Sequence, residues 1–398
     1  MLKANTYDCI VVGAGIFGIT TALEMRARGY QVAVFDPGPL PHPLAASTDI
    51  SKVVRMAYGS DDTYVAMAEQ AYKGWLQWNE KLGDTLFHEV GLVNLTHTPM
   101  SPGGFEYESY HLLLQRGHHP ERLIGDAITQ RFPAWKPGVY VDGFFHAQAG
   151  YAESGRVVDT LIRLAQAQGV TLHAGETVET LLKEDHQVTG IRTRAGNTFY
   201  AEHIVVASGA WIPLLVPDLA SILKITGQPV FHLKPADPEL FTPPYFAVFT
   251  ADTARTGWYG FPLHPREQVV KIGNHGVGQL LHPERDERVV TETDVEQLRT
   301  FLAGTLPALQ DAPIVATRRC LYADTPDGDF WIDRHPQWAS LTVAGGDSGH
   351  AFKFAPILGG LIADAVEGKT NHWLPKFRWR DFPSHNVKKE ASRYQGEI

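Results

Sequence analysis

The sequence predicts an α/β protein with a Rossmann-like nucleotide-binding domain and a smaller antiparallel α+β domain. Residues 7–36 follow the order strand, glycine-rich turn, helix and strand, which is a βαβ unit. Residues 229–278 instead alternate short apolar segments with Pro and Gly turns, a pattern typical of antiparallel sheets. The length of 398 residues suits two or three domains.

The first βαβ unit is defined by three local signals. Residues 7–12 form a short apolar run, as a buried parallel strand does. A helical pattern follows the glycine turn and runs through Arg28, where Gly29 is suited to end the helix. Residues 31–35 form a second apolar strand, which ends at Asp36.

The remaining elements follow from apolar periodicity and from Gly or Pro stops. Helices are predicted at residues 61–82, 157–168, 291–303 and 356–366. Strands are predicted at 170–173, 177–182, 187–194, 198–200, 203–208 and 341–344, with short strands and loops over 84–150.

The turn between the first strand and helix carries a dinucleotide fingerprint. Gly13, Gly15 and Gly18 form a GxGxxG motif, and Asp36 lies 23 residues after Gly13. The glycines allow a tight turn, close approach to a pyrophosphate and close helix packing, while the acid binds a ribose diol. A ligand-free tight turn is the alternative, but the complete βαβ context favours a nucleotide site.

The motif does not by itself distinguish NAD from FAD. Its position at the start of a chain of this length is typical of FAD-dependent oxidoreductases, in which later segments return to complete the flavin site. Residues 205–210 are similar to the strand and glycine segment that such folds place beside the first unit.

Composition excludes several other classes. The formal net charge of −9, without a basic run, argues against nucleic-acid binding. The two cysteines, Cys9 and Cys320, cannot form a disulfide framework or a zinc site with several thiolates. No leader or membrane span is evident, so we expect a cytoplasmic protein with no metal.

Three distal segments carry a more specific signal: CLYADTPD at 320–327, FWIDRHP at 330–336 and GDSGHAFKF at 346–354. Together with the fingerprint they resemble the monomeric sarcosine oxidase family, which includes N-methyltryptophan, pipecolate and fructosyl-amino-acid oxidases. The resemblance covers nearly the whole chain. It implies a fold of the glutathione-reductase-like, D-amino-acid-oxidase type.

The resemblance implies that FAD is bound covalently through Cys320. It also implies that Arg55 and Lys353 hold a substrate carboxylate and that Lys271 activates oxygen. Tyr259 and His275 match substrate-side residues. One cation about 4 Å from a nascent anion supplies about 4 kcal/mol at an effective dielectric of about 20, or roughly a thousandfold in rate.

The resemblance further implies that a wider set of residues contacts FAD or completes the catalytic site. These are Ile16, Ser47, Thr48, Lys52, Val178, Gly209, Trp211, Asp347, Gly349 and His350.

The pocket departs from the sarcosine oxidase pattern and combines residues typical of two enzyme types within the family. Thr48 and Lys52 stand where sarcosine-type enzymes carry His and Arg, and lysine at 52 is similar to fructosyl-amino-acid oxidases. His275, however, is sarcosine-like where those enzymes carry a glutamate. The size of the side chain accepted and the exact substrate therefore stay open.

We expect an oxidase of N-substituted or cyclic secondary α-amino acids, with hydride transfer to flavin N5, imine hydrolysis and reduction of O₂ to H₂O₂. Alternatives are a fructosyl-amino-acid oxidase, a same-fold dehydrogenase with another electron acceptor, and a flavin-containing RNA-modifying or binding protein. We expect a monomer whose partners are an amino-acid substrate and O₂, without nucleic acid or membrane. The expected FAD domain spans 1–83, 150–225 and 318–398, and the substrate domain 84–149 and 226–317.

Overall fold

The computed structural model describes residues 5–382, 391–394 and 396. The chain divides into two compact units, each assembled from separate segments. The first comprises residues 1–49, 153–225 and 321–389, and the second comprises 50–152, 226–320 and 390–398. No helix among the described residues is long and apolar enough to span a membrane.

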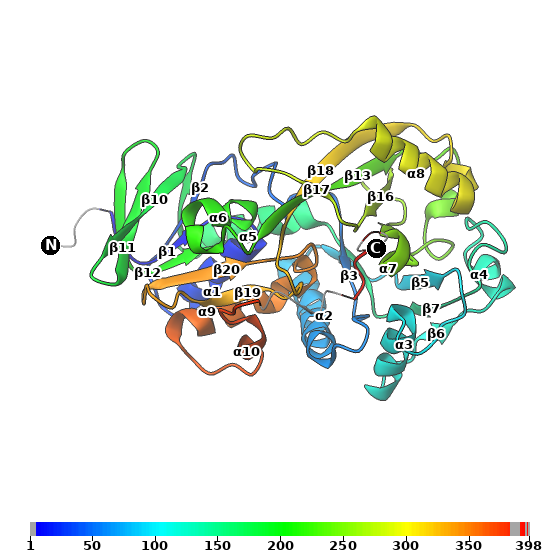
Figure 1. The fold of residues 1–398 in the computed structure, drawn as a ribbon, viewed down its shortest axis with the longest axis horizontal. Helices are drawn as coiled ribbons and strands as arrows, with labels where there is room; N and C mark the ends of the chain where they lie inside the picture. The colour runs from blue at the N-terminus through cyan, green and yellow to red at the C-terminus, as the bar shows by residue number, and fades with distance from the viewer. Residues whose placement is uncertain (1–4, 383–390, 395, 397–398) are drawn as a thin grey trace. The chain divides into compact units, whose positions relative to one another are not determined.

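The first unit is built on an eight-stranded sheet (Figure 1). Its central strands β20, β12, β1, β2 and β9 are parallel neighbours in that order. Strands β10, β11 and β19 are added in antiparallel pairs. The bounds are β1 Thr6–Val12, β2 Val32–Asp36, β9 Thr171–Ala174, β10 Val178–Glu184, β11 Gln187–Thr193, β12 Thr198–Val206, β19 Trp331–Arg334 and β20 Leu341–Gly345.

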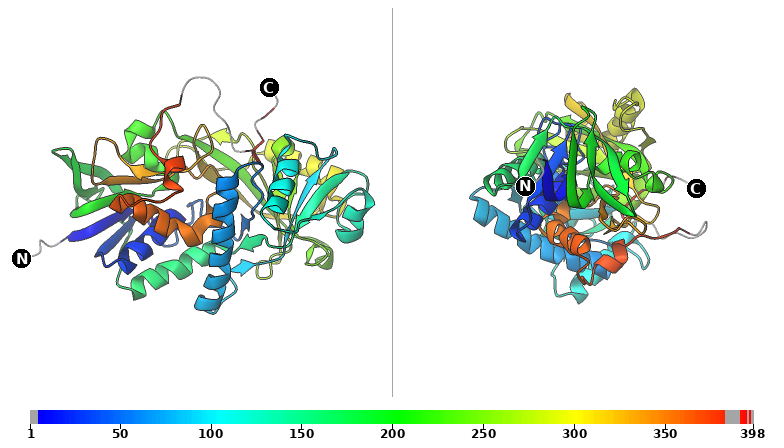
Figure 2. Two further views of the ribbon diagram at one scale, coloured as in Figure 1. Left: turned by 90° about the horizontal axis from the view of Figure 1, so that it is seen from below. Right: turned by 90° about the vertical axis from the view of Figure 1, so that its left-hand side faces the viewer.

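Three long helices accompany this sheet. Helix α1 (Ile16–Ala27) packs against both α5 (Ser154–Ala167) and α9 (Ala355–Glu367), as Figures 1 and 2 show. The contact with α9 is close, because a Cβ atom added to Gly359 would lie 2.4 Å from the carbonyl oxygen of Thr20. Short helices α6 (Ile212–Leu215) and α10 (Leu374–Phe377) complete the unit.

The second unit contains a nine-stranded sheet and a three-stranded sheet. The larger sheet has the order β17, β13, β16, β15, β14, β5, β7 and β6, with β18 paired to β13. Strands β14 and β5 run parallel within an otherwise antiparallel run from β13 to β6. The bounds are β5 Leu92–Thr96, β6 Glu121–Arg122, β7 Asp142–His146, β13 Lys224–Leu233, β14 Val248–Ala251, β15 Trp258–Gly260, β16 Val270–Asn274, β17 Gln279–Leu280 and β18 Ile314–Asp324.

The smaller sheet has the order β3 (Lys52–Val54), β8 (Gly150–Ala152) and β4 (Phe87–His88). The helices of this unit are α2 Asp62–Leu82, α3 Phe105–Gln115, α4 Asp126–Arg131, α7 Thr253–Thr256 and α8 Glu292–Thr305. Helix α8 begins with a capping box, in which Thr291 and Asp294 bind each other's backbone N–H groups.

The second unit includes residues 50–83, which the sequence analysis placed with the nucleotide-binding segments. The reason is local packing. Asn79 of α2 donates to the carbonyl oxygen of Phe87 in β4 at 2.7 Å, and the Trp75 ring lies 6.1 Å from the Phe87 ring.

The elements that were predicted from the sequence agree with the structure except in two regions, while β3, β18 and β19 were not predicted. Residues 198–200 and 203–208 were predicted as two strands, but β12 is continuous over Thr198–Val206 and pairs with β11 at one end and with β20 at the other. Helices α3 and α4 lie where the sequence predicted only short strands and loops.

Candidate functional site

The glycine turn of the first unit has the geometry that its motif predicts. Gly13 has φ of +103°, and a Cβ atom there would lie 2.7 Å from the carbonyl oxygen of Ala207. A Cβ atom on Gly18 would lie 1.8 Å from the Gly13 carbonyl oxygen. Larger residues at either position would therefore push apart β1, α1 and β12.

The acid and the hydroxyl residue predicted beside the turn are in contact with it. Asp36 accepts hydrogen bonds from Ala14 N at 2.9 Å and from Gly38 N at 3.0 Å. Ser47 Oγ accepts from Ile16 N, at the start of α1, at 3.0 Å. The backbone thus orients the Asp36 carboxylate at the end of β2, where a ribose hydroxyl would bind it.

Two buried hydroxyl groups also fit a bound dinucleotide. Thr48 Oγ1 and Ser208 Oγ are inaccessible to solvent and have no hydrogen-bond partner among the described residues. Ser208 precedes Gly209, and its Cα lies 3.0 Å from the Cβ position of Gly13. Buried polar atoms are normally satisfied, so a ligand at the glycine turn accounts for both, and the residues present fit FAD.

Residues 345–350 form a turn whose backbone is held by its own carboxylate. Asp347 accepts from Ala323 N at 3.0 Å and from Gly349 N at 3.2 Å. Gly349 has φ of +75°, and a Cβ atom there would lie 2.2 Å from the Tyr322 ring. The turn is therefore fixed against the two residues that follow Leu321.

Lys353 and His350 lie just after this turn. Lys353 is 4% exposed, and its Nζ donates to the His350 carbonyl oxygen at 2.6 Å. The His350 ring Nε2 lies 2.9 Å from the carbonyl oxygen of Gly328. Both residues thus belong to the structure that joins the turn to α9.

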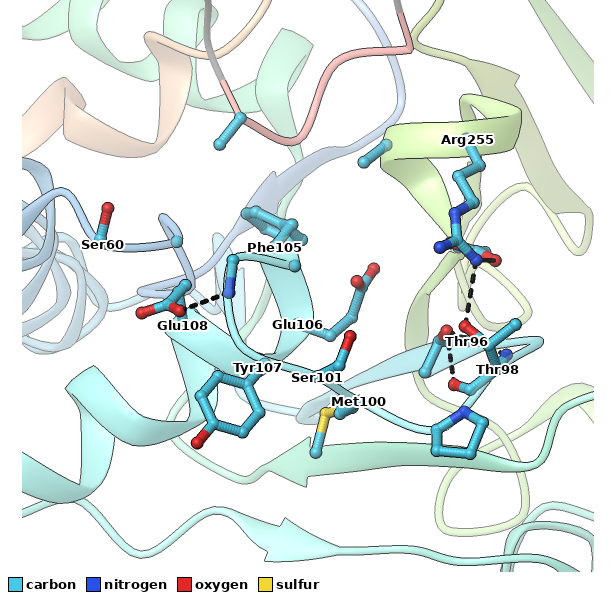
Figure 3. A pocket seen from close by; sticks show the side chains of 17 residues that line it. Ser60, Thr96, Thr98, Met100, Ser101, Phe105, Glu106, Tyr107, Glu108 and Arg255 are labelled. Atoms are coloured by element: carbon cyan, nitrogen blue, oxygen red, sulfur yellow. Dashed lines mark hydrogen bonds and ion pairs between the residues drawn. The ribbon is translucent and has the colours of Figure 1, made fainter.

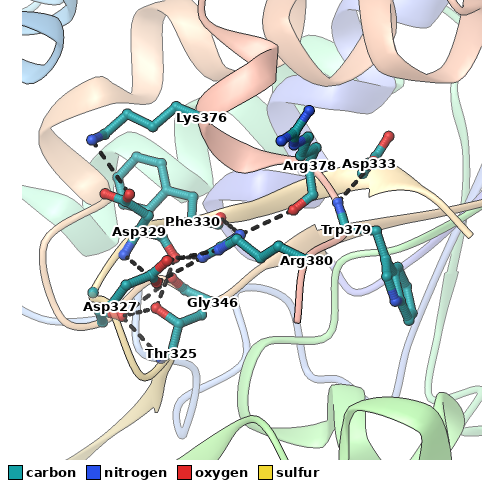
Figure 4. Close-up of polar contacts among 12 residues, drawn as sticks. Thr325, Asp327, Asp329, Phe330, Asp333, Gly346, Lys376, Arg378, Trp379 and Arg380 are labelled. Carbon is teal, nitrogen blue, oxygen red and sulfur yellow. Dashed lines mark hydrogen bonds and ion pairs between the residues drawn. The ribbon is translucent and has the colours of Figure 1, made fainter. Parts of the chain in front are cut away.

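An arginine near the C-terminus holds the facing loop of the same unit (Figure 4). Arg380 donates to both carboxylate oxygens of Asp327 at 2.7 Å and to the carbonyl oxygens of Asp329 and Phe330 at 3.0 and 3.1 Å. Thr325 of this loop makes a 3.2 Å hydroxyl contact with Ser348. The sequence analysis did not single out Arg380.

The other residues predicted near FAD in the first unit are spread over two elements. Val178 begins β10 and belongs to the apolar core of the sheet. Trp211 lies in the turn after β12, where its ring is 6.2 Å from the ring of His42.

Cys9 is fully buried in β1, and burial raises the pKa of its thiol to about 12.

One face of the large sheet in the second unit is apolar, and the other carries polar residues beside the apolar side chains of Leu92 and Val248. Val270, Ile272, Trp258, Phe249, Val93 and Leu95 belong to a core cluster. The intervening residues face the other way. Register places Gly273 beside Tyr259, Tyr259 beside Thr250, and Thr250 beside Asn94. Thr250 Oγ1 donates to Asn94 Oδ1 at 2.8 Å, although both residues are almost fully buried.

Lys271 lies on this polar face, two residues before Gly273. It is 1% exposed, its Nζ donates to the carbonyl oxygen of Ser51, and its Nζ lies 4.7 Å from the centre of the Phe261 ring. Lysine is almost never this buried without a partner. The carbonyl and the ring face partly offset the cost of removing the ammonium from water.

Tyr259 and His275 lie beside Lys271 in the same sheet region. The Tyr259 hydroxyl lies 2.7 Å from the Cβ position of Gly273, so the ring lies over the glycine backbone. His275 follows β16, is 8% exposed, and donates its backbone N–H to the Gly257 carbonyl oxygen at 2.7 Å. The structure thus gathers three predicted site residues on adjoining strands.

Lys52 and Cys320 are brought together within the second unit. Lys52 Nζ lies 3.8 Å from Cys320 Sγ, and the cysteine is 2% exposed. The residues are 268 positions apart in the chain. The two side chains thus come within contact distance although they lie far apart in the sequence.

Arg55 occupies a buried aromatic site of its own. Its guanidinium lies 4.6 Å from the centre of the Tyr58 ring and 5.5 Å from that of Phe105, and Nη2 donates to Ser392 Oγ at 2.7 Å. It is 7% exposed. The sequence analysis did not foresee that residues near the C-terminus reach this arginine.

A cavity of about 370 Å³ in the second unit contains the buried carboxyl group of Glu106 (Figure 3). Burial, with a smaller contribution from Asp252, raises the pKa of Glu106 to about 7. Glu106 was not predicted from the sequence. Phe105, Ser109 and Leu113 recur at helical spacing and are buried on the same helix, but no local pattern marks Glu106 as buried.

Comparison with known proteins defines the class. Residues 8–365 match the DAO family, described as FAD dependent oxidoreductase. The chain therefore belongs to this family of FAD-dependent oxidoreductases.

Its similarity to individual relatives extends over nearly its full length. It is 31% identical over 384 residues to an N-methyl-L-tryptophan oxidase of Salmonella agona, with 94% of this chain and 99% of that protein covered. The same enzyme of Salmonella typhimurium is also 31% identical with equal coverage.

Solved structures give the same architecture. Fructosyl amine: oxygen oxidoreductase (Amadoriase I) from Aspergillus fumigatus has a TM-score of 0.81 at 26% identity and covers 100% of this chain and 95% of that one. The fructosyl peptide oxidase from E. terrenum has a TM-score of 0.84 at 22% identity, and the match covers 98% of this chain and 96% of that one. At this identity the match supports the fold but not the function. The predicted fold class and enzyme class, an FAD-dependent amine oxidase, are confirmed.

Proposed function

We propose that the protein oxidises the C–N bond of N-substituted or cyclic secondary α-amino acids and passes the electrons to O₂. The observation that carries the proposal is that Arg55, Lys271 and Lys353 are each at least nine-tenths buried. A positive charge held out of water interacts strongly with a nearby negative charge. These residues would therefore stabilise an anionic substrate and the negative charge that develops during the reaction.

In this proposal Arg55 and Lys353 bind the α-carboxylate, because a guanidinium and an ammonium both bind carboxylates with charge-assisted hydrogen bonds. Fixing the carboxylate orients the amine for reaction. Tyr259 and His275 lie on the substrate side, and Thr48 contributes beside the cofactor.

Bound FAD would supply the two-electron acceptor for this oxidation. The substrate loses two electrons and two protons, and the imine formed is hydrolysed by water. O₂ takes up two electrons and two protons to give H₂O₂. Lys271 supplies a fixed positive charge where negative charge develops on oxygen.

We further propose that FAD is attached through Cys320. The supporting observation is that Lys52 Nζ lies 3.8 Å from Sγ, which places a cation beside the sulfur that would form the bond. Gly13, Gly15, Ile16, Gly18, Asp36, Ser47 and Thr48 would hold the adenosine and pyrophosphate. Val178, Gly209, Trp211, Asp347, Gly349 and His350 would complete the site.

A second candidate function is the oxidation of fructosyl amino acids. The similarity to Amadoriase I and the lysine at position 52 favour it. The substrate would differ in its N-substituent, and Arg55 and Lys353 would keep the same roles.

The deciding experiment is a peroxide assay on the purified holoenzyme with sarcosine, N-methyl amino acids, pipecolate and fructosyl amino acids. We expect peroxide with at least one secondary amino acid. Bleaching of the flavin without oxygen, followed by slow recolouring in air, would instead identify a dehydrogenase. Absence of bleaching with every compound would refute the proposal.

A further inference from the structure

The cavity beside Glu106 has no role in the chemistry described above. It lies wholly within the second unit and is bounded by the loop after β5, the first turn of α3, and α7 (Figure 3). Its volume of about 370 Å³ is large enough for an amino-acid side chain, since small-molecule pockets begin near ~300 Å³. Apolar walls come from Met100 and Phe105.

The cavity contains a buried acid whose side chain is not fully satisfied. Glu106 is 6% exposed, and its Oε1 has no hydrogen-bond partner among the described residues. Figure 3 shows its carboxyl group directed into the cavity, between Phe105 and Arg255. A buried carboxyl oxygen without a donor is costly, so a ligand donor at this position would be stabilising.

A second carboxylate strengthens the negative character of the cavity. Asp252 is 3% exposed and lines the same cavity. Its Oδ2 lies 3.6 Å from Arg255 Nη1 and 3.1 Å from His97 Nδ1. Arg255 is 62% exposed at its side chain and also donates to Thr98 Oγ1 at 3.1 Å. The single arginine is thus engaged by Asp252, which leaves the charge of Glu106 without an equal partner in the cavity wall.

The cavity shares its walls with the surroundings of Arg55. Phe105 lines the cavity, and its ring lies 5.5 Å from the Arg55 guanidinium. Ala391 also lines the cavity, and the next residue, Ser392, accepts a hydrogen bond from Arg55. A molecule whose carboxylate is held at Arg55 therefore has this cavity as its neighbour.

We propose that the Glu106 cavity binds the positively charged end of the substrate side chain, so that the preferred substrates are N-substituted α-amino acids with an ammonium or guanidinium group. This inference rests on the proposed function, in which Arg55 holds the α-carboxylate. A cation would give Glu106 Oε1 its missing donor and would offset the buried charge of this carboxylate. A neutral apolar side chain would leave both costs in place.

Protonation provides an independent signature of this binding mode. Glu106 titrates near neutral pH because of burial and because Asp252 lies nearby, while Arg255 opposes the shift. Glu108 and Tyr107 of α3 and His97 beside Asp252 are the other titratable groups around the cavity. A bound cation favours the ionised form of Glu106, so binding near pH 7 releases a proton.

The primary test compares α-N-methyl-L-lysine with α-N-methyl-L-norleucine, which has a similar side chain without the ammonium. We expect the holoenzyme to prefer the lysine compound in kcat/KM by about tenfold or more, the range of one charge-assisted hydrogen bond. Glu106→Gln should lower kcat/KM for the lysine compound until the preference is lost, and Glu106→Asp should keep part of the preference. The matched control is Glu296→Gln, an exposed glutamate on α8 of the same unit.

A binding measurement separates this inference from the proposed function. Isothermal titration of the holoenzyme with n-butylammonium, in buffers of different ionisation enthalpy, should show binding with proton release at pH 7, and Glu106→Gln should abolish both. If no amino acid is oxidised, the proposed function fails, and this titration alone shows whether the cavity binds a cation. Equal kcat/KM values for the two N-methyl compounds, or n-butylammonium binding that Glu106→Gln leaves unchanged, would overturn the inference. A preference for fructosyl compounds that Glu106→Gln removes would also overturn it and indicate a polyol site.

Discussion

At the scale of single residues, the structure places charge where water is excluded. Lys271 is the extreme case, with 1% of its surface exposed. Its position is fixed from both sides, by the Ser51 carbonyl oxygen and by the face of the Phe261 ring. An ammonium held in this way does not need to reorganise when negative charge develops beside it, which is the condition for electrostatic catalysis.

Replacing Lys271 by Met should therefore separate the two halves of the reaction. Methionine keeps the length and much of the volume but removes the charge. We expect flavin reoxidation by O₂ to slow by roughly a thousandfold, as about 4 kcal/mol implies, with a much smaller effect on anaerobic flavin reduction. Stopped-flow absorbance measures both steps. Slower reduction with unchanged reoxidation would refute the oxygen role.

The contact between Lys52 and Cys320 leads to a prediction about the cofactor linkage. Lys52 Nζ lies 3.8 Å from the Cys320 sulfur, where a positive charge would stabilise negative charge that develops during attachment. Lys52→Met should therefore slow covalent attachment by about tenfold or more, while Lys52→Arg retains the charge.

The measurement is the flavin absorbance that stays with the polypeptide after acid precipitation. A thiol count on the denatured protein checks it independently, because a linked Cys320 leaves only Cys9 to react. Full attachment in Lys52→Met would show that the cation is not needed.

Glu106 gives a pH prediction whose sign can be worked out. Its pKa is raised from 4.5 to about 7 in the folded protein, so between these values the folded state binds more protons than the unfolded state. The free energy of unfolding therefore falls as pH rises through this window. The glutamine of Glu106→Gln cannot ionise. The free energy of unfolding of this variant, relative to that of the wild type, should therefore rise by up to about 3 kcal/mol between pH 4.5 and 8.

Urea unfolding at both pH values measures this difference. Glu296→Gln serves as the control, because it removes the same charge from an exposed position on α8. A constant difference between wild type and Glu106→Gln across this range would contradict the raised pKa.

At the scale of elements, the 327–330 loop of the first unit is supported by the segment that follows α10. Arg380 makes hydrogen bonds to Asp327 and to two carbonyl oxygens of the 327–330 loop. Its guanidinium also lies 4.7 Å from the centre of the Trp331 ring. One side chain thus connects the chain end to the loop that meets Ser348.

Arg380→Met should loosen this loop. We expect a loss of about 1–3 kcal/mol in the free energy of unfolding, the range for hydrogen bonds to charged groups, and faster release of noncovalently bound FAD from a Cys320→Ser background. Arg378→Met, two residues away and exposed, is the matched control. Melting temperature and flavin fluorescence are the readouts, and equal behaviour of the two variants would show that Arg380 does not hold the loop.

The elements also show what could be predicted from the sequence. The first βαβ unit was predictable because the glycine turn, the apolar strands and Gly29 are all local signals. Helix α3 could not be predicted in this way, because a buried glutamate interrupts its apolar pattern. The hydrogen bonds of Arg380 join residues that are far apart in the sequence, since 53 positions separate Arg380 from Asp327. No local pattern encodes such a pairing.

The same distinction applies to the candidate site. The Gly13 turn and Asp36 follow from one motif, and the resemblance to amine oxidases supplied Lys271, Lys353 and Cys320. Ser51 and Ser392 were missed because a carbonyl oxygen or a serine hydroxyl becomes a partner only through tertiary structure. Glu106 was missed because single acidic residues are usually exposed, and only burial distinguishes this one.

At the scale of the whole molecule, the chain passes between the two units at five points, and the first four of them lie within residues 5–382. In the first unit, the ends of one excursion are adjacent, because Gly155 N donates to the Asp49 carbonyl oxygen at 2.7 Å. In the second unit, Arg319 Nη1 donates to the Gly227 carbonyl oxygen at 3.2 Å, beside the other pair of crossings. Each excursion therefore leaves and returns at nearly the same place.

This arrangement predicts that the first unit can fold alone if its three segments are joined. Asp49 would be linked to Glu153, and Ile225 to Leu321, by short Gly/Ser linkers. Such a chain keeps β20 beside β12 and α9 against α1. We expect cooperative unfolding and noncovalent FAD binding, because the glycine turn and Asp36 are present and Cys320 is not.

The control is the uninterrupted fragment 1–225, which lacks β20 and α9. It exposes the edge of β12 and the α1 surface that Gly359 otherwise contacts, so we expect aggregation or a molten state. Circular dichroism and the quenching of FAD fluorescence distinguish the two chains. If the spliced chain also fails to fold, the nucleotide-binding sheet requires the second unit for its stability. If fragment 1–225 binds FAD as well as the spliced chain does, β20 and α9 are dispensable for the nucleotide site.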